Sequence, residues 1–438
     1  MTYRLYYADS FLRTFSASVV DIRESSRAGG VSLWQIALDR TAFYPTSGGQ
    51  PCDTGTLTAT SRTGAVLEVP IESVEEDPPA AGTENASRHD APGQVWHFTR
   101  KPLAAGTAVH GAIDWPRRLD HIQQHSGQHL LSAVFARELD TPTVSFHLGD
   151  AVSTIDIATG PIAHHTLDRI ERLANEIIAE DRPVTIRTVD RAEAETLRAA
   201  GALRKLPERS GAIRLIEIAD FDLNACGGTH VRSTGQIGSL LLRSTERVSR
   251  GLRVEFVCGL RAVVAARHDF ALLGRAASAL SIGRDDIPSA IERLQAEAKS
   301  SAKERQKLRE ELASYHATRL AVEVMIEDNL RLVRRTFADR DRDYVRLLAS
   351  RVCATVPRTV ALFVSAETDP ARIFLAASRD ITLNCGEFLR EALTAHGLRG
   401  GGSPDLAQGD LPRAGTDEVA ATLAARLRSL LARPHSAE

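Results

Sequence analysis

The alternation of apolar and polar positions divides the first part of the chain into short strands. Up to about residue 70, the segments SASVVDIRE, VSLWQIALDR and GTLTAT alternate the two kinds of side chain and are separated by turns that contain Gly and Ser. A period of two is typical of strands with one buried face. We therefore predict a small β-barrel over residues 1–100.

Strand and helix patterns are mixed between residues 101 and 260. HIQQHSGQHLLSAVF and HTLDRIERLANEIIAEDR carry apolar positions at helical spacing, whereas VSFHLGD, VSTIDIAT and VTIRTVDR alternate like strands. GSLLLRSTERVSRGLRVEFVCG predicts two further strands joined by a basic turn. This mixture predicts an α+β domain.

Residues 261–325 form a predicted helical spacer. Its later part carries a weak heptad pattern that is broken in the middle. The a and d positions are Ile291, Leu294, Ala298, Ser301, Arg305, Leu308, Leu312 and Tyr315. In residues 326–438 we expect a helix over 328–352, strands at TVALFVSA and RIFLAAS, a helix at CGEFLREALTA and a final amphipathic helix. That order predicts a C-terminal α/β domain.

Composition adds several restrictions. A chain of 438 residues holds more than one domain, and with a net charge of -2 any contact with a polyanion depends on local basic surface. Five scattered cysteines give no disulfide framework and favour a reducing cytoplasm. No leader pattern or long apolar run is found, so we expect neither a signal peptide nor a membrane span. Residues 72–93 are acidic and contain proline, which predicts a mobile insertion.

Two short segments offer metal ligands. His125 and His129 lie four residues apart, and on a helix they share one face. Cys226 and His230 enclose two glycines and a threonine, a sequence that favours a tightly curved loop. Imidazole and thiolate ligands together suit zinc. His121 also precedes His125 by four residues, so spacing alone does not choose between the pairs, and a His pair without any ligand role is the alternative.

Two glycine-containing segments have competing interpretations. TAFYPTSGGQPCDTG, residues 41–55, predicts an irregular loop, and a plain surface turn is its alternative. Gly400, Gly401 and Gly402 follow Arg399 and would allow a phosphate to approach the backbone closely. A flexible turn is the other interpretation.

These motifs together resemble a known family. HSGQHLL followed by CGGTH, preceded by TAFYPTSGGQPCDTG and followed by a helical spacer and GGGSPDLAQG, is similar to the long-form alanyl-tRNA editing proteins of the AlaX type. These are free-standing relatives of the editing half of alanyl-tRNA synthetase. The resemblance covers nearly the whole chain in the right order. It implies a β-barrel, a zinc-binding editing domain over residues 101–260, the spacer, and a C-terminal DHH-associated domain that meets tRNA or a second subunit as a homodimer.

The resemblance also implies the chemistry. One zinc ion per chain would be bound by His125, His129, Cys226 and His230, which makes His121 a flanking residue. The reaction would hydrolyse the ester that joins serine or glycine to alanine tRNA, through a zinc-bound water with His230 or Cys226 assisting. No aminoacylation domain precedes these regions, so we expect deacylation and not charging. Because four protein ligands close a tetrahedral site, displacement of one ligand, expanded coordination and a positioning metal all stay open.

Substrate selection requires polar groups, because a pocket that excludes by size admits alanine wherever serine fits. Thr41 is the first candidate to bind the serine hydroxyl and Gln128 the second, with Gly48, Gly49 and Gln50 completing the substrate loop.

The body of the tRNA would meet basic residues near the C-terminal domain, since phosphate contacts position a nucleic acid. The candidates are Arg331, Arg334, Arg335, Arg399 and Gly400–Gly402. Two rival functions stand beside deacylation. A zinc peptidase would need a Glu beside the His pair, but position 126 is Ser. A non-catalytic tRNA-binding or assembly protein with a structural zinc stays open.

Overall fold

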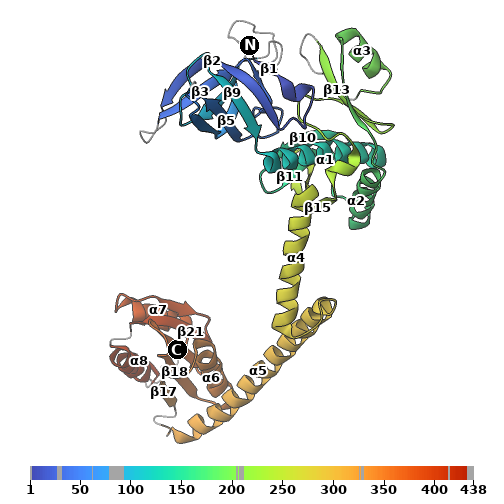
Figure 1. The fold of residues 1–438 in the computed structure, drawn as a ribbon. Coiled ribbons are helices and arrows are strands. Elements are labelled where there is room, and N and C mark those ends of the chain that lie inside the picture. The colour runs from blue at the N-terminus through green and yellow to red at the C-terminus, as the bar shows by residue number, and fades with distance from the viewer. Residues whose placement is uncertain are drawn as a thin grey trace. The chain divides into compact units, whose positions relative to one another are not determined.

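The computed structural model describes residues 2–26, 32–61, 63–77, 93–203, 206, 212–324, 326, 330–412 and 415–431. It contains two compact units, Met1–Arg275 and Ala276–Glu438. The mixture of helices and several sheets agrees with the predicted α+β class (Figure 1). Each unit is described by itself.

Seven antiparallel strands form the first sheet, in the order β6-β5-β9-β2-β3-β8-β7. Their bounds are β2 (Thr14–Ser26), β3 (Ser32–Leu38), β5 (Gly55–Thr60), β6 (Val66–Ile71), β7 (Ser73–Glu76), β8 (Val95–Thr99) and β9 (Ala108–Ile113). Apolar side chains on one face, among them Val19, Ile36 and Leu57, make the core. The sheet extends past residue 100, because β9 pairs with β2 and β5. A short parallel pair, β1 (Tyr3–Arg4) and β4 (Arg40–Thr41), lies beside the 3-10 helix η1 (Leu5–Tyr7).

The predicted closed barrel is wrong. Among the described residues no hydrogen-bonded pairing joins the edge strands β6 and β7. Only Glu72 separates them, so the two strands run end to end and cannot lie side by side as a pair. The predicted insertion over 72–93 is also partly wrong, because β7 lies within it; residues 78–92 lie outside the described residues.

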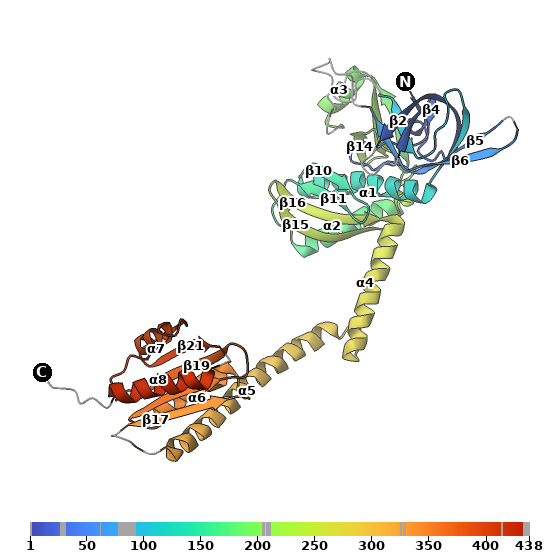
Figure 2. The same cartoon turned by 90° about the vertical axis from the view of Figure 1, so that its left-hand side faces the viewer.

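The second part of the first unit is built around helix α1 (Trp115–Leu139). The side chain of Asp114 accepts a hydrogen bond from the Arg117 amide and caps the start of the helix, and Asp140 ends it with a positive φ of 50°. A four-stranded sheet, β10-β11-β16-β15, packs against α1 (Figure 2). A three-stranded sheet has the order β12-β13-β14. The loop that follows β14 carries Cys226 and His230 and is called the ligand loop below.

The predicted strands and helices of this part are present in the predicted order, and β13, β14 and η2 lie between them without having been predicted. The elements after α1 are β10 (Thr143–Leu148), β11 (Ser153–Ile157), α2 (His164–Ala179), β12 (Val184–Val189), α3 (Arg191–Ala199), β13 (Ile213–Ile218), β14 (Asp222–Ala225), η2 (Thr234–Ile237), β15 (Leu240–Val248) and β16 (Gly251–Cys258).

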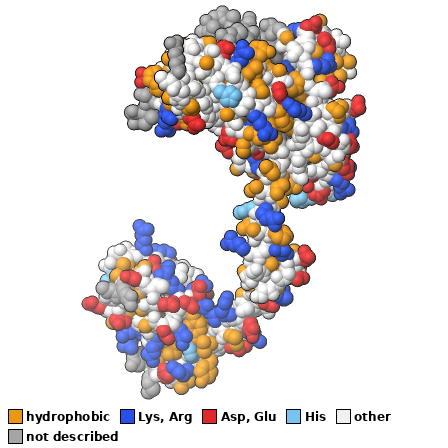
Figure 3. Space-filling view, viewed as in Figure 1, with side chains coloured by type: hydrophobic (Ala, Val, Ile, Leu, Met, Phe, Trp, Pro, Cys, Tyr) orange, Lys and Arg blue, Asp and Glu red, His pale blue; other side chains and the backbone are white. Residues whose placement is uncertain are grey.

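The predicted spacer is helical and consists of two helices, α4 (Gly259–Leu280) and α5 (Ile287–Glu323). Hydrophobic side chains lie on the surface of α4 (Figure 3), and the exposed ones include Val263, Val264 and Phe270. The α5 helix buries Ala313, Ala317 and Leu320 against α6. None of the described helices is long and apolar enough to span a bilayer.

The second unit has a five-stranded sheet in the order β17-β18-β19-β21-β20, covered on one face by α5 and α6 and on the other by α7 and α8. The elements are β17 (Arg331–Phe337), α6 (Arg342–Thr355), β18 (Thr359–Ser365), β19 (Ala371–Ala377), α7 (Cys385–Thr394), β20 (Gly400–Gly402), β21 (Leu406–Leu411) and α8 (Thr416–Leu431).

Two predictions in this unit are wrong. The helix expected over residues 328–352 is a strand followed by a helix, because RLVRRTF pairs along its whole length with the fully buried strand β18. The flexible turn considered for Gly400–Gly402 is also wrong, because these glycines form β20, which pairs with β21. A Cβ on Gly402 would lie 2.4 Å from the carbonyl oxygen of Leu406, so close backbone packing requires glycine there.

Candidate metal centre

Helix α1 presents His125 and His129 toward one point. They are four residues apart, and their ring centroids lie 5.2 Å apart. Both are buried, because α1 is covered by the four-stranded sheet on one side and by the ligand loop on another. The imidazoles therefore face the interior of the unit.

The ligand loop follows β14 and carries Cys226 and His230. Arg214 of β13 holds this loop by donating to the carbonyl oxygens of Cys226 at 2.8 Å and Gly228 at 2.9 Å. A Cβ on Gly228 would lie 2.1 Å from the His125 ring, so only glycine lets the loop approach the helix this closely.

The structure brings the four predicted ligands together. One ligand atom from each of His125, His129, Cys226 and His230 lies within 4.8 Å of the others. The Cys226 Sγ atom is 3.4 Å from Nε2 of His125 and 3.2 Å from Nε2 of His230. Three imidazoles and one thiol are a donor set that suits zinc.

The other ring nitrogens are already engaged. Nδ1 of His125 donates to Oε1 of Gln50 at 2.8 Å, and Nδ1 of His230 lies 3.2 Å from Oγ of Ser126. An acceptor such as the Gln50 carbonyl oxygen fixes the tautomer of His125, and both partners help to fix the orientation of the rings. Nε2 is therefore the nitrogen that each of these two rings turns toward Cys226.

Burial also controls the charge of the site. It lowers the pKa of His125 and of His230 well below the ordinary value, and the neighbouring histidines add to the shift. Neutral imidazole is the form that binds a metal. Neutral rings with oriented Nε2 atoms and an adjacent thiol thus fit zinc.

His121 lies outside this cluster. It is 3% exposed, and among the described residues its buried Nδ1 atom has no hydrogen-bond partner. Burial lowers its pKa to about 4. Although its spacing to His125 equals that of His129, the cluster contains His129 and not His121.

A cavity of about 170 Å³ borders the cluster. Its described lining residues come from the N-terminal segment, the 41–55 loop, β7, α1 and the ligand loop. They are Tyr6, Tyr7, Tyr44, Pro45, Ser47, Gly48, Glu76, His125, Ala225, Cys226, Gly227 and Gly228. The site is therefore shared between the seven-stranded sheet and the α+β part of the unit.

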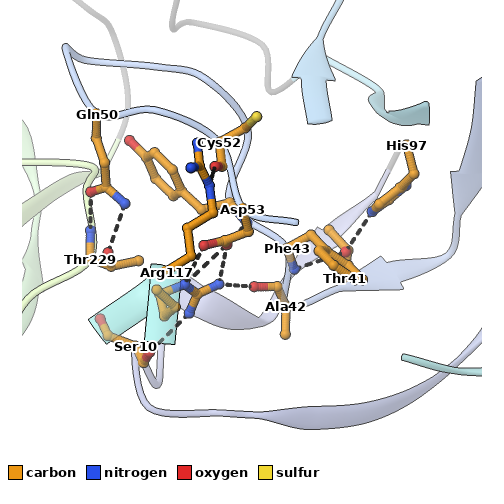
Figure 4. A network of polar contacts seen from close by, with 12 residues as sticks. Ser10, Thr41, Ala42, Phe43, Gln50, Cys52, Asp53, His97, Arg117 and Thr229 are labelled. Carbon is orange, nitrogen blue, oxygen red and sulfur yellow. Dashed lines mark hydrogen bonds and ion pairs between the residues drawn. The ribbon is translucent and has the colours of Figure 1, made fainter. Parts of the chain in front are cut away.

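The substrate residues predicted from the 41–55 loop occupy different environments. Gly48 lines the cavity. Gly49 packs under the ring of Phe146, since a Cβ there would come within 2.7 Å of it. Gln50 is fully buried and joins the loop to Thr229, whose amide donates to its Oε1 at 3.1 Å and whose hydroxyl accepts from its Nε2 at 2.9 Å (Figure 4).

Thr41 and Gln128 are both buried. The Thr41 hydroxyl contacts Nε2 of His97 at 2.8 Å and accepts from the Phe43 amide (Figure 4), and Thr41 is not among the described residues that line the cavity. Gln128 donates to Ser132, while its buried Oε1 has no partner within the part of the chain that the structure describes.

Sequence reasoning missed a fully buried ion pair beneath the site. Nε of Arg118 lies 2.9 Å from Oδ1 of Asp53, and the guanidinium also donates to the carbonyl oxygens of Ser10 and Ala42. Figure 4 shows Asp53 facing this network. The Ser10 hydroxyl in turn accepts from the His230 amide. A signal existed in the sequence, since an arginine three residues before His121 falls on the buried side of α1.

The predicted tRNA-contacting residues lie in the second unit. Arg331, Arg334 and Arg335 are on β17, and Arg335 pairs with Glu323 of α5 at 3.5 Å. Arg399 immediately precedes β20.

Known proteins resemble this chain over most of its length. Residues 213–254 match the family described as the "Threonyl and Alanyl tRNA synthetase second additional domain". An alanine–tRNA ligase of Pyrococcus abyssi is 31% identical over 93% of this chain, and one of Thermococcus kodakarensis is 32% identical over 93%. The chain spans 42% and 41% of these two relatives.

A solved structure, the C-Ala domain from Aquifex aeolicus alanyl-tRNA synthetase, aligns with 25% of this chain and 99% of its own length. The sequence identity there is 23% and the TM-score 0.23. The relationship to alanyl-tRNA synthetases therefore rests on sequence similarity over 93% of the chain and not on this structural alignment. The chain is homologous to alanine–tRNA ligases, over a region that makes up less than half of their length.

Proposed function

We propose that this chain is an aminoacyl-tRNA deacylase that removes serine or glycine from mischarged alanine tRNA, with one zinc ion in the four-residue cluster. The observation that supports it most is that the cluster borders a cavity, which His125 and Cys226 help to line. Homology to alanine–tRNA ligases supports alanine tRNA as the nucleic acid. The activity of the whole ligase is not part of the proposal, because the chain covers less than half of its relatives.

The reaction is the addition of water to an ester. Water attacks the carbonyl carbon and the bond to the ribose oxygen breaks. That oxygen takes one of the two protons of the water, the other passes to solvent, and the amino acid leaves as a carboxylate. Zinc bound by the cluster would supply Lewis-acid polarisation of the carbonyl. The chain's own contribution is orientation: Gln50 and Ser126 hold the rings of His125 and His230, and Arg214 holds the loop between them and the cavity.

Arginine side chains stacked on aromatic rings support the binding of a single-stranded nucleic acid near the site. The Cζ atom of Arg13 lies 4.2 Å from the ring centroid of Trp115, and that of Arg232 lies 4.7 Å from the centroid of Phe11. The two rings are 5.3 Å apart. Arginine and aromatic side chains together bind unpaired nucleotides by stacking and charge, as the 3′ end of a tRNA would require.

Contacts to the tRNA body are assigned to the second unit. Arg331, Arg334, Arg335 and Arg399, with the glycine strand, remain our candidates there, and we expect the binding to weaken with added salt. A homodimer through this unit is part of the same proposal.

The second candidate function is a non-catalytic tRNA-binding protein. One observation favours it, namely that four protein side chains converge in the cluster, as in closed structural zinc sites. A deacylation assay on seryl- and alanyl-tRNA separates the two functions. The proposed function predicts release of serine that stops when zinc is removed by a chelator and returns with added zinc. Zinc-independent or absent release would contradict it.

A further inference from the structure

The cavity beside the cluster has one acidic side chain in its described wall, that of Glu76. We propose that Glu76 binds the free α-ammonium group of the aminoacyl ester, so that the site acts only on esters of unblocked amino acids. This inference rests on the proposed deacylase function and names the feature of the substrate that the site reads.

The cavity has room for a small aminoacyl group. Its volume of about 170 Å³ is several times the roughly 10–15 Å³ that a single water needs on the same measure. We therefore place the seryl or glycyl group in this cavity, beside His125 and Cys226.

The hydrogen bonds of Glu76 leave one carboxylate oxygen for a ligand. Its Oε1 atom accepts from the Gly93 amide at 3.0 Å and contacts the guanidinium of Arg4. Within the described ranges no hydrogen bond to Oε2 is found. Arg4 also donates to the Tyr7 hydroxyl at 2.9 Å, but it is not among the described residues that line the cavity. Glu76 is thus part of the described cavity wall, whereas Arg4 is not.

Three tyrosines, Tyr6, Tyr7 and Tyr44, are also part of the described wall. The Tyr7 ring already faces the guanidinium groups of Arg4 and Arg214. Tyr6 and Tyr44 are therefore the rings that remain for a small cation. The rings of Tyr6 and Tyr7 have centroids 4.9 Å apart, and those of Tyr6 and Tyr44 are 5.2 Å apart. Burial raises the pKa of Tyr6 and of Tyr44, so their side chains stay neutral. Neutral aromatic faces attract an ammonium, and a carboxylate beside them adds a charged hydrogen bond.

The same cavity would also hold the ester carbonyl of the substrate. His125 and Cys226 are part of its lining. In an aminoacyl ester the ammonium-bearing carbon is bonded directly to the carbonyl carbon. An ammonium held at Glu76 therefore restricts where the carbonyl can lie and keeps it within the cavity that the metal ligands border.

The test compares two esters on the full-length, zinc-loaded protein. The first substrate is alanine tRNA mischarged with serine. The second is the same tRNA carrying N-acetylserine, which has no ammonium group. We expect the wild type to show a kcat/KM roughly 10- to 100-fold lower for the acetylated ester, the range for a lost hydrogen bond to a charged group. Glu76→Gln should lower kcat/KM for the free ester by a similar factor and change the acetylated ester by less than about twofold. Glu75→Gln, at the exposed neighbour on β7, is the control and should leave the ratio unchanged.

The outcomes separate this inference from the proposed function. If the wild type hydrolyses both esters equally well, or if Glu76→Gln slows both by the same factor, Glu76 only holds Arg4 and Gly93 in place, and the inference is wrong while the deacylase function stands. If neither ester is hydrolysed, the proposed function fails and takes the inference with it.

Discussion

The side-chain carbonyl oxygen of Gln50 accepts a hydrogen bond of 2.8 Å from Nδ1 of His125, which lies 75 positions later in the sequence. A carbonyl oxygen only accepts, so this contact places the proton of His125 on Nδ1 and leaves Nε2 free to face Cys226. A residue expected to touch the substrate therefore orients His125, one of the four proposed metal ligands.

The first prediction concerns this contact. Gln50→Leu removes the acceptor for His125 and for the Thr229 amide, and we expect zinc affinity to fall roughly 10- to 100-fold. Gln50→Glu retains an acceptor oxygen and should lose far less. Competition with a chromophoric chelator measures both affinities. Gln306→Leu, at an exposed position of α5, is the control, and equal affinities for all three variants would sink the idea.

The second prediction distinguishes the ligands from their neighbour. His125→Ala and Cys226→Ala should each lose most of the bound zinc and nearly all deacylation, because each removes one of the four atoms that converge. His121→Ala should retain both. Zinc content after gel filtration, measured by atomic emission, decides the point; a His121 variant that loses its metal would overturn the ligand set.

The clustering of His125, His129, Cys226 and His230 could be predicted from two local spacings together with a family resemblance. The sequence did not reveal how these four side chains are supported. Gln50, Ser10 and Arg118 act through contacts between distant segments, which no local periodicity encodes. The strand β17 was missed for a related reason, since RLVRRTF becomes a strand through pairing with a neighbour that lies later in the chain. The barrel was overpredicted because alternation reveals strands but not which edges pair.

The third prediction concerns the buried ion pair. Arg118→Leu leaves Asp53 buried without its partner, and we expect the free energy of unfolding to fall by about 3–5 kcal/mol. The double variant Arg118→Leu with Asp53→Leu should be less destabilised, because no unpaired charge remains. Arg100→Leu breaks the exposed pair with Glu72 and should cost about 0–1 kcal/mol. Urea unfolding curves measure all three, and an Arg118 variant as stable as the Arg100 variant would contradict the prediction.

The fourth prediction is a pH dependence of stability. Burial lowers the pKa of His97 to about 4 from an ordinary 6.5. Between these values the unfolded chain binds the proton and the folded one does not, so stability is full above pH 6.5 and is lost as the pH falls toward 4. The contribution is about 3 kcal/mol. The unfolding midpoints at pH 7 and pH 5 should differ more for the wild type than for His97→Gln. An equal difference between the two midpoints in both proteins would contradict the prediction.

The fifth prediction concerns Thr41. Its hydroxyl is occupied by His97 and by the Phe43 amide, so Thr41→Val should lower the unfolding free energy by about 1–3 kcal/mol by leaving a buried ring nitrogen unpaired. The ratio of seryl- to alanyl-tRNA hydrolysis should stay the same. A narrowed ratio would support the substrate role first proposed for Thr41. An unchanged ratio would move that role to Gln128, which precedes His129 and whose buried Oε1 has no partner among the described residues. Like Thr41, Gln128 is not among the described lining residues of the cavity. Gln128→Leu should then narrow the ratio.

The contact between Ser10 and His230 sets an order on the biogenesis of the site. The His230 amide binds the Ser10 hydroxyl across 220 positions, and the Arg232 guanidinium binds Asp9 across 223. Asp9 and Ser10 must therefore stay available until the ligand loop has been translated, roughly 10 to 45 s later at usual ribosomal speeds. During that interval the seven-stranded sheet has been made without the loop that carries Cys226 and His230, so the proposed metal cluster can assemble only after that loop has been made.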